Sequence, residues 1–181
     1  HIRVVQIAGW GSPTTKAIEY KTKHGALSYD LKFTIEGDKT VVYPSAVSSG
    51  GADETYFFNI FEYNDSSDED IQHRDLLSAS PVQNLIKLVI NKEDIIENNF
   101  VSNDKPSLGD IEDQLIVSTH SPVALGAYDQ LGNFTGIDPN QDFSADFLSI
   151  SEEIPGSTFS FTSDSQYIFL PKEGTYDFIY K

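Results

Sequence analysis

Residues 4–13 read Val-Val-Gln-Ile-Ala-Gly-Trp-Gly-Ser-Pro, a short apolar run that ends in a glycine-rich stretch. A run of this length, stopped by glycine and proline, is typical of a buried strand that enters a loop at its C-terminal end. Residues 28–35 alternate polar with apolar side chains, and residues 55–61 are rich in aromatic β-formers, so each stretch predicts a further strand. The acidic residues 64–70 predict a loop.

The clearest helix is expected directly after residue 79. Ser80 can cap it and Pro81 fits its first helical position. Apolar side chains then repeat at helical spacing, at Val82, Leu85, Ile86, Val89 and Ile90. Strands followed by an amphipathic helix predict α/β character for residues 1–98.

The composition changes after residue 98. Residues 99–112, with their asparagine, serine and proline, have the composition of a linker. In residues 113–181 helical periodicity disappears, and short strand candidates alternate with turn signals, one of them at 129–133. We place these strands at residues 115–118, 123–128, 157–161, 167–170 and 175–180. Strands at this spacing predict an all-β sandwich.

Asp38 and His73 are the residues that carry the most chemical information. Asp38 follows a glycine at the end of a predicted strand, and His73 precedes the amphipathic helix. A carboxylate on a fixed turn can hold a histidine tautomer, and a histidine on a loop can act as general base toward a hydroxyl. These features make Asp38 and His73 candidates for the acid and histidine of a catalytic triad. The plainer interpretation is turn chemistry for the aspartate and a surface or capping role for the histidine.

Three short motifs in the same order resemble lipases similar to lecithin–cholesterol acyltransferase. Residues 5–14 look like the strand and loop that precede the acid in that family, residues 37–41 resemble its Gly-Asp-Gly-Thr-Val segment, and residues 71–73 resemble its histidine loop. The resemblance covers about residues 3–92 and implies the C-terminal part of an α/β-hydrolase with the triad acid at Asp38 and the histidine at His73. Lys39 stands where that family often has glycine, and no Gly-x-Ser-x-Gly is present, so the nucleophile would lie in a missing N-terminal half.

The second half of the chain resembles a different family. Residues 121–136 and 153–157 look like parts of an immunoglobulin-like module of the kind appended to surface proteins. The resemblance implies an accessory role and an extracellular or cell-surface location.

These patterns lead to two hypotheses about function. The first is a C-terminal fragment of a serine ester hydrolase that supplies Asp38 and His73, is inactive alone, and acts on lipid or acyl esters when joined by its missing half. The alternative is a non-catalytic cell-surface or binding module with a degenerate hydrolase-like part. Ser12 and Ser45 are weaker nucleophile candidates, because neither lies in a strand–elbow–helix context.

The composition argues against several other classes of function. A formal net charge of −16 makes nucleic acid a poor partner, and the absence of cysteine excludes disulfides and thiolate metal sites. No apolar run approaches the length of a transmembrane helix. Residues 138–142 carry oxygen ligands but lack the glycine and glutamate of a calcium-binding EF-hand. We expect no cofactor and no bound metal.

Overall fold

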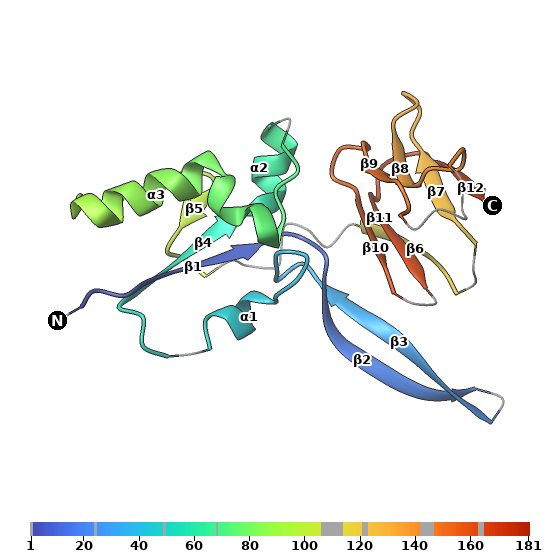
Figure 1. Ribbon diagram of the computed structural model, residues 1–181, viewed down its shortest axis with the longest axis horizontal. Helices are drawn as coiled ribbons and strands as arrows, with labels where there is room; N and C mark the ends of the chain where they lie inside the picture. Colours follow the sequence, from blue (N-terminus) through green and yellow to red (C-terminus); the bar gives the residue numbers. More distant parts are fainter. Residues whose placement is uncertain are drawn as a thin grey trace. The chain divides into compact units, whose positions relative to one another are not determined.

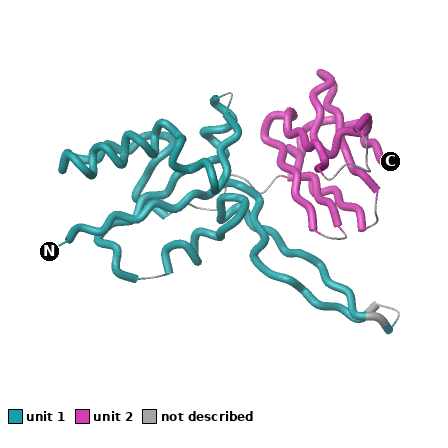
Figure 2. Tube along the Cα trace, viewed as in Figure 1, with its two compact units in different colours: residues 1–111 teal, residues 112–181 magenta. Residues whose placement is uncertain are grey.

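The computed structural model describes residues 2–23, 25–48, 50–67, 69–105, 114–120, 123–141, 147–162 and 165–181. The chain divides into two compact units, residues 1–111 and residues 112–181 (Figure 2). Each unit has a hydrophobic core of its own.

A three-stranded sheet forms the centre of the first unit (Figure 1). Its strands are β1 (Val5–Trp10), β4 (Glu54–Asn59) and β5 (Val101–Ser102), in the order β1-β4-β5. Strands β1 and β4 run parallel, whereas β4 and β5 run antiparallel. The parallel pairing brings Trp10, at the end of β1, opposite Asn59, at the end of β4.

Alternating residues of β4 point to opposite faces of this sheet, as the pleat requires. On one face, Phe58 packs with helices α2 (Ile60–Ser66) and α3 (Ser80–Asn91) in the main core of the unit. On the other face, Phe57 meets Tyr43 of the short helix α1 (Tyr43–Ala46), with ring centroids 5.4 Å apart in an edge-on arrangement. The 3-10 helix η1 (His73–Ser78) leads into α3.

A long antiparallel hairpin lies between β1 and α1 in the sequence. It consists of β2 (Thr14–Lys23) and β3 (Ala26–Thr34), and extends away from the rest of the unit (Figure 1). The pairing has an irregularity between Thr15 and Ala17. The hairpin begins two residues after Ser12, which forms a bridge with Asp38, and it ends four residues before Asp38. Both of its ends therefore lie next to the loop that contains Asp38.

The second unit has two antiparallel sheets that share one core. The first has the order β10-β11-β6 and the second the order β12-β7-β8-β9. The strands are β6 (Gln114–Thr119), β7 (Leu125–Tyr128), β8 (Phe134–Ile137), β9 (Ile150–Glu152), β10 (Thr158–Phe161), β11 (Gln166–Pro171) and β12 (Asp177–Tyr180). Leu125 of one sheet and Ile168 of the other both belong to the buried cluster, so this unit agrees with the expected β-sandwich.

The expectation of a partial α/β-hydrolase in residues 1–98 is wrong. The structure is 42% strand and 18% helix, and its described strands form four small sheets in which β1–β4 is the one parallel pair. The segment between β1 and β4 folds back on itself as the β2–β3 hairpin, where a doubly wound sheet would place a crossover helix. Because the alternating residues of β2 and β3 pair with each other, the chain forms an all-β fold and not a doubly wound α/β sheet.

Several boundaries also differ from the expectations. The strand expected at 55–61 ends at Asn59, because the Asn59 side chain accepts the Glu62 N–H and starts α2. Helix α2 consequently covers residues 64–66 of the expected acidic loop. Ser80 is the first residue of α3, and Ala79 occupies the N-cap without a side-chain hydrogen bond. Strand β5 lies inside the expected linker 99–112, whose residues 106–112 are outside the described residues.

Candidate functional site

Asp38 lies on a tight turn that is fixed from both sides. Gly37 forms an antiparallel bridge with Val42, and Asp38 forms a parallel bridge with Ser12, just after β1. The Ser12 N–H donates to the Gly37 carbonyl at 2.9 Å. The end of β1 and the root of the hairpin thus hold the Asp38 backbone in place.

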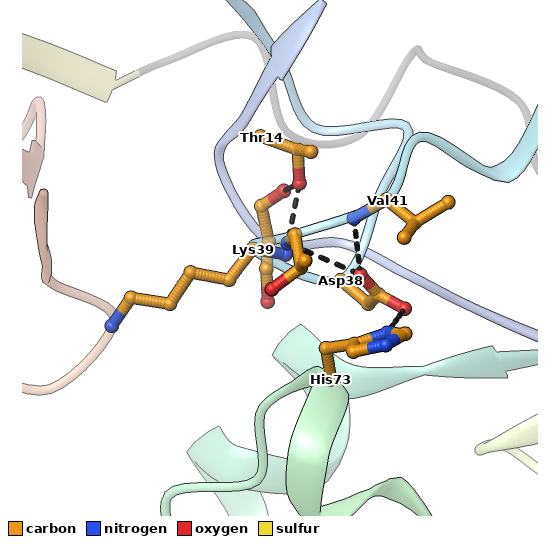
Figure 3. A network of polar contacts seen from close by, with 7 residues as sticks. Thr14, Asp38, Lys39, Val41 and His73 are labelled. Atoms are coloured by element: carbon orange, nitrogen blue, oxygen red, sulfur yellow. Dashed lines mark hydrogen bonds and ion pairs between the residues drawn. The ribbon is translucent and has the colours of Figure 1, made fainter. Parts of the chain in front are cut away.

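The Asp38 carboxylate uses its two oxygens differently. Oδ1 accepts the backbone N–H of Val41 at 2.7 Å and that of Thr40 at 3.2 Å. Oδ2 lies 2.7 Å from Nδ1 of His73 (Figure 3). One oxygen is therefore bound by the turn, which aims the other at the imidazole ring.

His73 is attached to Asp38 by its main chain as well as by its side chain. Its N–H donates to the Asp38 carbonyl at 3.0 Å, at the start of η1. An ionised carboxylate can only accept, so Nδ1 carries the proton that faces Asp38, and in the neutral ring Nε2 keeps its lone pair. The two contacts fix both the position and the tautomer of the ring.

The two side chains differ in how far they are exposed to solvent. The Asp38 side chain is 7% exposed and that of His73 is 48% exposed. The carboxylate is shielded from water, and this shielding strengthens its hydrogen bonds. The histidine side chain, in contrast, has access to solvent. This arrangement can accept a proton at Nε2 and stabilise the resulting imidazolium.

Both predicted site residues are therefore brought together by the structure. Sequence reasoning missed two others, Thr14 and Gly9. Thr14 Oγ1 donates to the Ser12 carbonyl at 2.8 Å and accepts the Lys39 N–H at 2.9 Å. Gly9 leaves the space beside Asp38 that a side chain would fill, because a Cβ there would lie 2.9 Å from Asp38 Cβ. In the sequence, Thr14 follows a proline and Gly9 lies near the end of a predicted strand. Neither feature indicates a contact with an aspartate far along the chain.

Lys39 departs from the expected behaviour. Its backbone has a φ of 77°, which is the left-handed region that favours glycine. A lysine next to Asp38 could pair with its carboxylate in place of His73, but the Lys39 side chain extends away from that carboxylate (Figure 3).

The candidate nucleophiles do not reach the histidine. Ser12 meets Asp38 through the main chain, and Ser45 lies in α1. Within the described residues, the His73 ring makes its hydrogen bond to Asp38 and to no serine. A hydroxyl at Nε2 would have to come from elsewhere.

The remaining histidines belong to other environments. His120 Nδ1 lies 2.8 Å from the Ser165 hydroxyl, and its ring meets the edge of Tyr167 in the second unit. Ser165 is buried, and no carboxylate contacts His120 within the described part of the chain. These contacts are compatible with the structural role expected for His120. His24 lies outside the described residues.

Two observations concern partners of the site. The described residues contain no group of three or more histidines or acids placed to hold a metal ion. None of the helices in the described ranges is long and apolar enough to span a bilayer.

Comparison with known proteins found no match to this chain among family models, curated proteins or solved structures. The resemblance to lipases similar to lecithin–cholesterol acyltransferase is therefore not supported by any relative, and the strand-rich fold contradicts it. The Asp38–His73 pair has to be interpreted from its own geometry.

Proposed function

We propose that Asp38 and His73 are the acid and general base of a serine-type ester hydrolase site. The observation that supports this proposal is the 2.7 Å contact between Asp38 Oδ2 and His73 Nδ1. It joins a buried carboxylate, already oriented by two backbone amides, to a half-exposed imidazole that meets Asp38 through Nδ1 and not through Nε2. A surface ion pair would not need such support for the carboxylate.

In the proposed reaction, Nε2 of His73 removes the proton of a serine hydroxyl while its oxygen attacks the acyl carbon of an ester. The tetrahedral intermediate collapses to an acyl-enzyme, and the proton on Nε2 passes to the departing alcohol. Water, deprotonated by the same nitrogen, then releases the carboxylic acid. Asp38 stays ionised throughout and stabilises the imidazolium. Because no described serine reaches His73, the proposal takes the nucleophile from outside residues 1–181.

The second unit is proposed to be an immunoglobulin-like accessory module. Its support is the pair of antiparallel sheets that close over one core. Together with the ester-hydrolase site, it favours an extracellular or cell-surface location.

The test uses the natural full-length protein and a fluorophosphonate probe that labels activated serines. We expect labelling and hydrolysis of p-nitrophenyl acyl esters, with turnover lowered on the order of 10⁴-fold in Asp38→Asn and at least as much in His73→Ala. His120→Ala is the matched control and keeps its turnover, because His120 lies in the other unit. Labelling that survives His73→Ala unchanged would contradict the proposal. Residues 1–181 alone should show no turnover.

A second candidate is a non-catalytic binding module. The observation that favours it is that, over the described residues, no hydroxyl meets the His73 ring. It predicts that the full-length protein is neither labelled by the fluorophosphonate nor active on esters, while Asp38→Asn lowers only the free energy of unfolding.

A further inference from the structure

The side chain of Asn64 binds the main chain of the segment that leads into His73. Asn64 Oδ1 accepts the N–H of Ile71 at 3.0 Å, and Asn64 Nδ2 donates to the carbonyl of the same residue at 3.0 Å. Directly opposed residues of an antiparallel sheet exchange two such bonds. Asn64 therefore does for Ile71, two residues before His73, what a neighbouring strand would do.

Ile71 depends on these two bonds because it is buried. It is 5% exposed and belongs to the main core of the first unit. A buried main-chain N–H or carbonyl without a partner destabilises a fold, and nearly all such groups are paired. Over the described residues, Asn64 supplies both hydrogen bonds of the Ile71 main chain.

Asn64 is itself carried by a well-anchored element. It lies in α2, which starts at the end of β4 with the side chain of Asn59 as its cap. The adjacent Tyr63 is 6% exposed, and its ring meets those of Phe58 and Phe100 at centroid distances of 5.4 Å. The two bonds from Asn64 thus attach the segment before His73 to the packed core.

The chemistry of asparagine suits this position. Its carboxamide combines an acceptor oxygen with an N–H donor, which matches the one donor and one acceptor of a main-chain residue. An aspartate would keep the acceptor and place a second oxygen toward the Ile71 carbonyl. An alanine would remove both bonds.

From this arrangement we propose that Asn64 is a positioning residue for His73, which acts through Ile71. The Asp38 carbonyl accepts the His73 N–H and holds the histidine from one side, while Asn64 holds the incoming chain from the other. A general base works within hydrogen-bond reach of the proton that it removes, so the entry of this chain sets where Nε2 lies. The inference rests on the proposed ester hydrolysis and names a residue outside the Asp38–His73 pair on which the geometry of that pair depends.

The first test uses the chain itself and requires no catalysis. Two protons of His73 are followed by NMR: the Nδ1 proton, which faces Asp38 Oδ2, and the main-chain N–H, which donates to the Asp38 carbonyl. In Asn64→Ala both should exchange with water about tenfold faster or more, because the segment before His73 loses its attachment. Asn64→Asp keeps the bond to the Ile71 N–H and is the second variant if the alanine change unfolds the chain. It should accelerate the exchange of the same two protons.

Asn98→Ala is the matched control. Asn98 Oδ1 also holds two main-chain groups of the first unit, since it accepts the N–H of Phe100 at 2.8 Å and that of Val101 at 3.0 Å. This variant should lower the urea midpoint and leave the exchange of the two His73 protons unchanged. Equal acceleration in Asn98→Ala, or no acceleration in the folded Asn64 variants, would overturn the proposal, because Asn64 would then contribute stability alone.

The second test separates this inference from the proposed function. In the natural full-length protein, kcat on p-nitrophenyl acyl esters should fall about 10- to 100-fold in Asn64→Ala with little change in KM, and stay unchanged in Asn98→Ala. A kcat that falls equally in the two variants would overturn the positioning role. A full-length protein that is inactive on esters and not labelled by the fluorophosphonate would contradict the ester hydrolase, and the exchange of the His73 protons would still decide the role of Asn64.

Discussion

The hydroxyl of Thr14 accepts the backbone N–H of Lys39 at 2.9 Å, across a separation of 25 residues. The same hydroxyl donates to the Ser12 carbonyl at 2.8 Å, and Thr14 is 1% exposed. One buried oxygen thus connects the end of β1, the first residue of β2 and the turn that carries Asp38. Thr14 is therefore a positioning residue for the Asp38–His73 pair, acting through the Asp38 turn.

Thr14→Val should disturb this pair more than its small change in shape suggests. Valine keeps the volume but leaves the Lys39 N–H and the Ser12 carbonyl without their partner, at a cost of about 1–3 kcal/mol in the free energy of unfolding. Thr14→Ser keeps the hydroxyl and should lose less. The specific measurement is the low-field Nδ1 proton resonance of His73, which should persist in Thr14→Ser and weaken or vanish in Thr14→Val. A resonance that is identical in both variants would show that Thr14 contributes stability alone.

Lys39→Gly should leave the chain equally stable or more stable. A non-glycine residue in the left-handed region costs about 1–2 kcal/mol, and the extra freedom of glycine in the unfolded chain returns about 0.5–1 kcal/mol of that. The net gain is about 0–1.5 kcal/mol, measured as a higher urea midpoint. Lys92→Gly is the matched control, since Lys92 has a φ of 59° at the end of α3, where glycine is common. Destabilisation at Lys39 together with a gain at Lys92 would mean that the Lys39 side chain makes a contact worth more than the backbone strain.

The sequence anticipates those parts of the fold that depend on local patterns. Residues 80–91 become α3 because their apolar stripe repeats at helical spacing, and residues 26–34 become β3 because they alternate. Strand β2 was not expected: residues 17–23 alternate as well, but Ile18 and Tyr20 are the only large apolar side chains among them.

For the candidate site, Asp38 and His73 were singled out mainly by the resemblance to a lipase family, which the fold contradicts, although the structure does bring the two residues together. The supports at Thr14 and Gly9 could not be predicted, because they act across long sequence separations that only the folded chain closes. The family assignment failed for a related reason: short glycine-containing motifs follow turn chemistry, which unrelated folds share.

Gly9→Ala should destabilise the first unit and move Asp38. The new Cβ would lie 2.8 Å from Cδ1 of both Ile60 and Leu76 and 2.9 Å from Cβ of Asp38. The two methyl groups are side-chain ends that can shift, but Asp38 Cβ is fixed by its turn. Overpacking of this kind costs about 1–3 kcal/mol, measured by urea unfolding, and the His73 Nδ1 proton should lose its low-field position.

The control for this variant is Gly126→Ala in the second unit. A Cβ there would lie 2.5 Å from a ring atom of Phe134, so this change should destabilise β7 and β8 and leave the His73 resonance unchanged. If both alanine variants altered that resonance equally, a general loss of stability would explain the effect and the steric argument at Asp38 would fail.

The last prediction concerns acid and the turn between β7 and β8. Asp129 Oδ1 accepts the backbone N–H of Leu131 and of Asn133, each at 2.9 Å, and Oδ2 accepts the Asn133 side-chain amide at 2.8 Å. Partial burial raises the pKa of Asp129, but these hydrogen bonds to its charged form outweigh that effect and lower the pKa below its ordinary value. The turn was expected from the sequence, and its hydrogen bonds confirm it.

A pKa that is lower in the folded state stabilises the fold above the unfolded-state pKa, and this contribution disappears as the pH falls through the folded-state pKa. The second unit should therefore lose protection from hydrogen exchange at β7 and β8 as the pH drops below about 4. Asp129→Asn should lower that protection at neutral pH and make it depend less on acid. Glu173→Gln removes one exposed carboxylate without such hydrogen bonds to a turn, and should leave the acid dependence of β7 and β8 in place. Equal flattening in both variants would assign the effect to net charge instead of to the Asp129 turn.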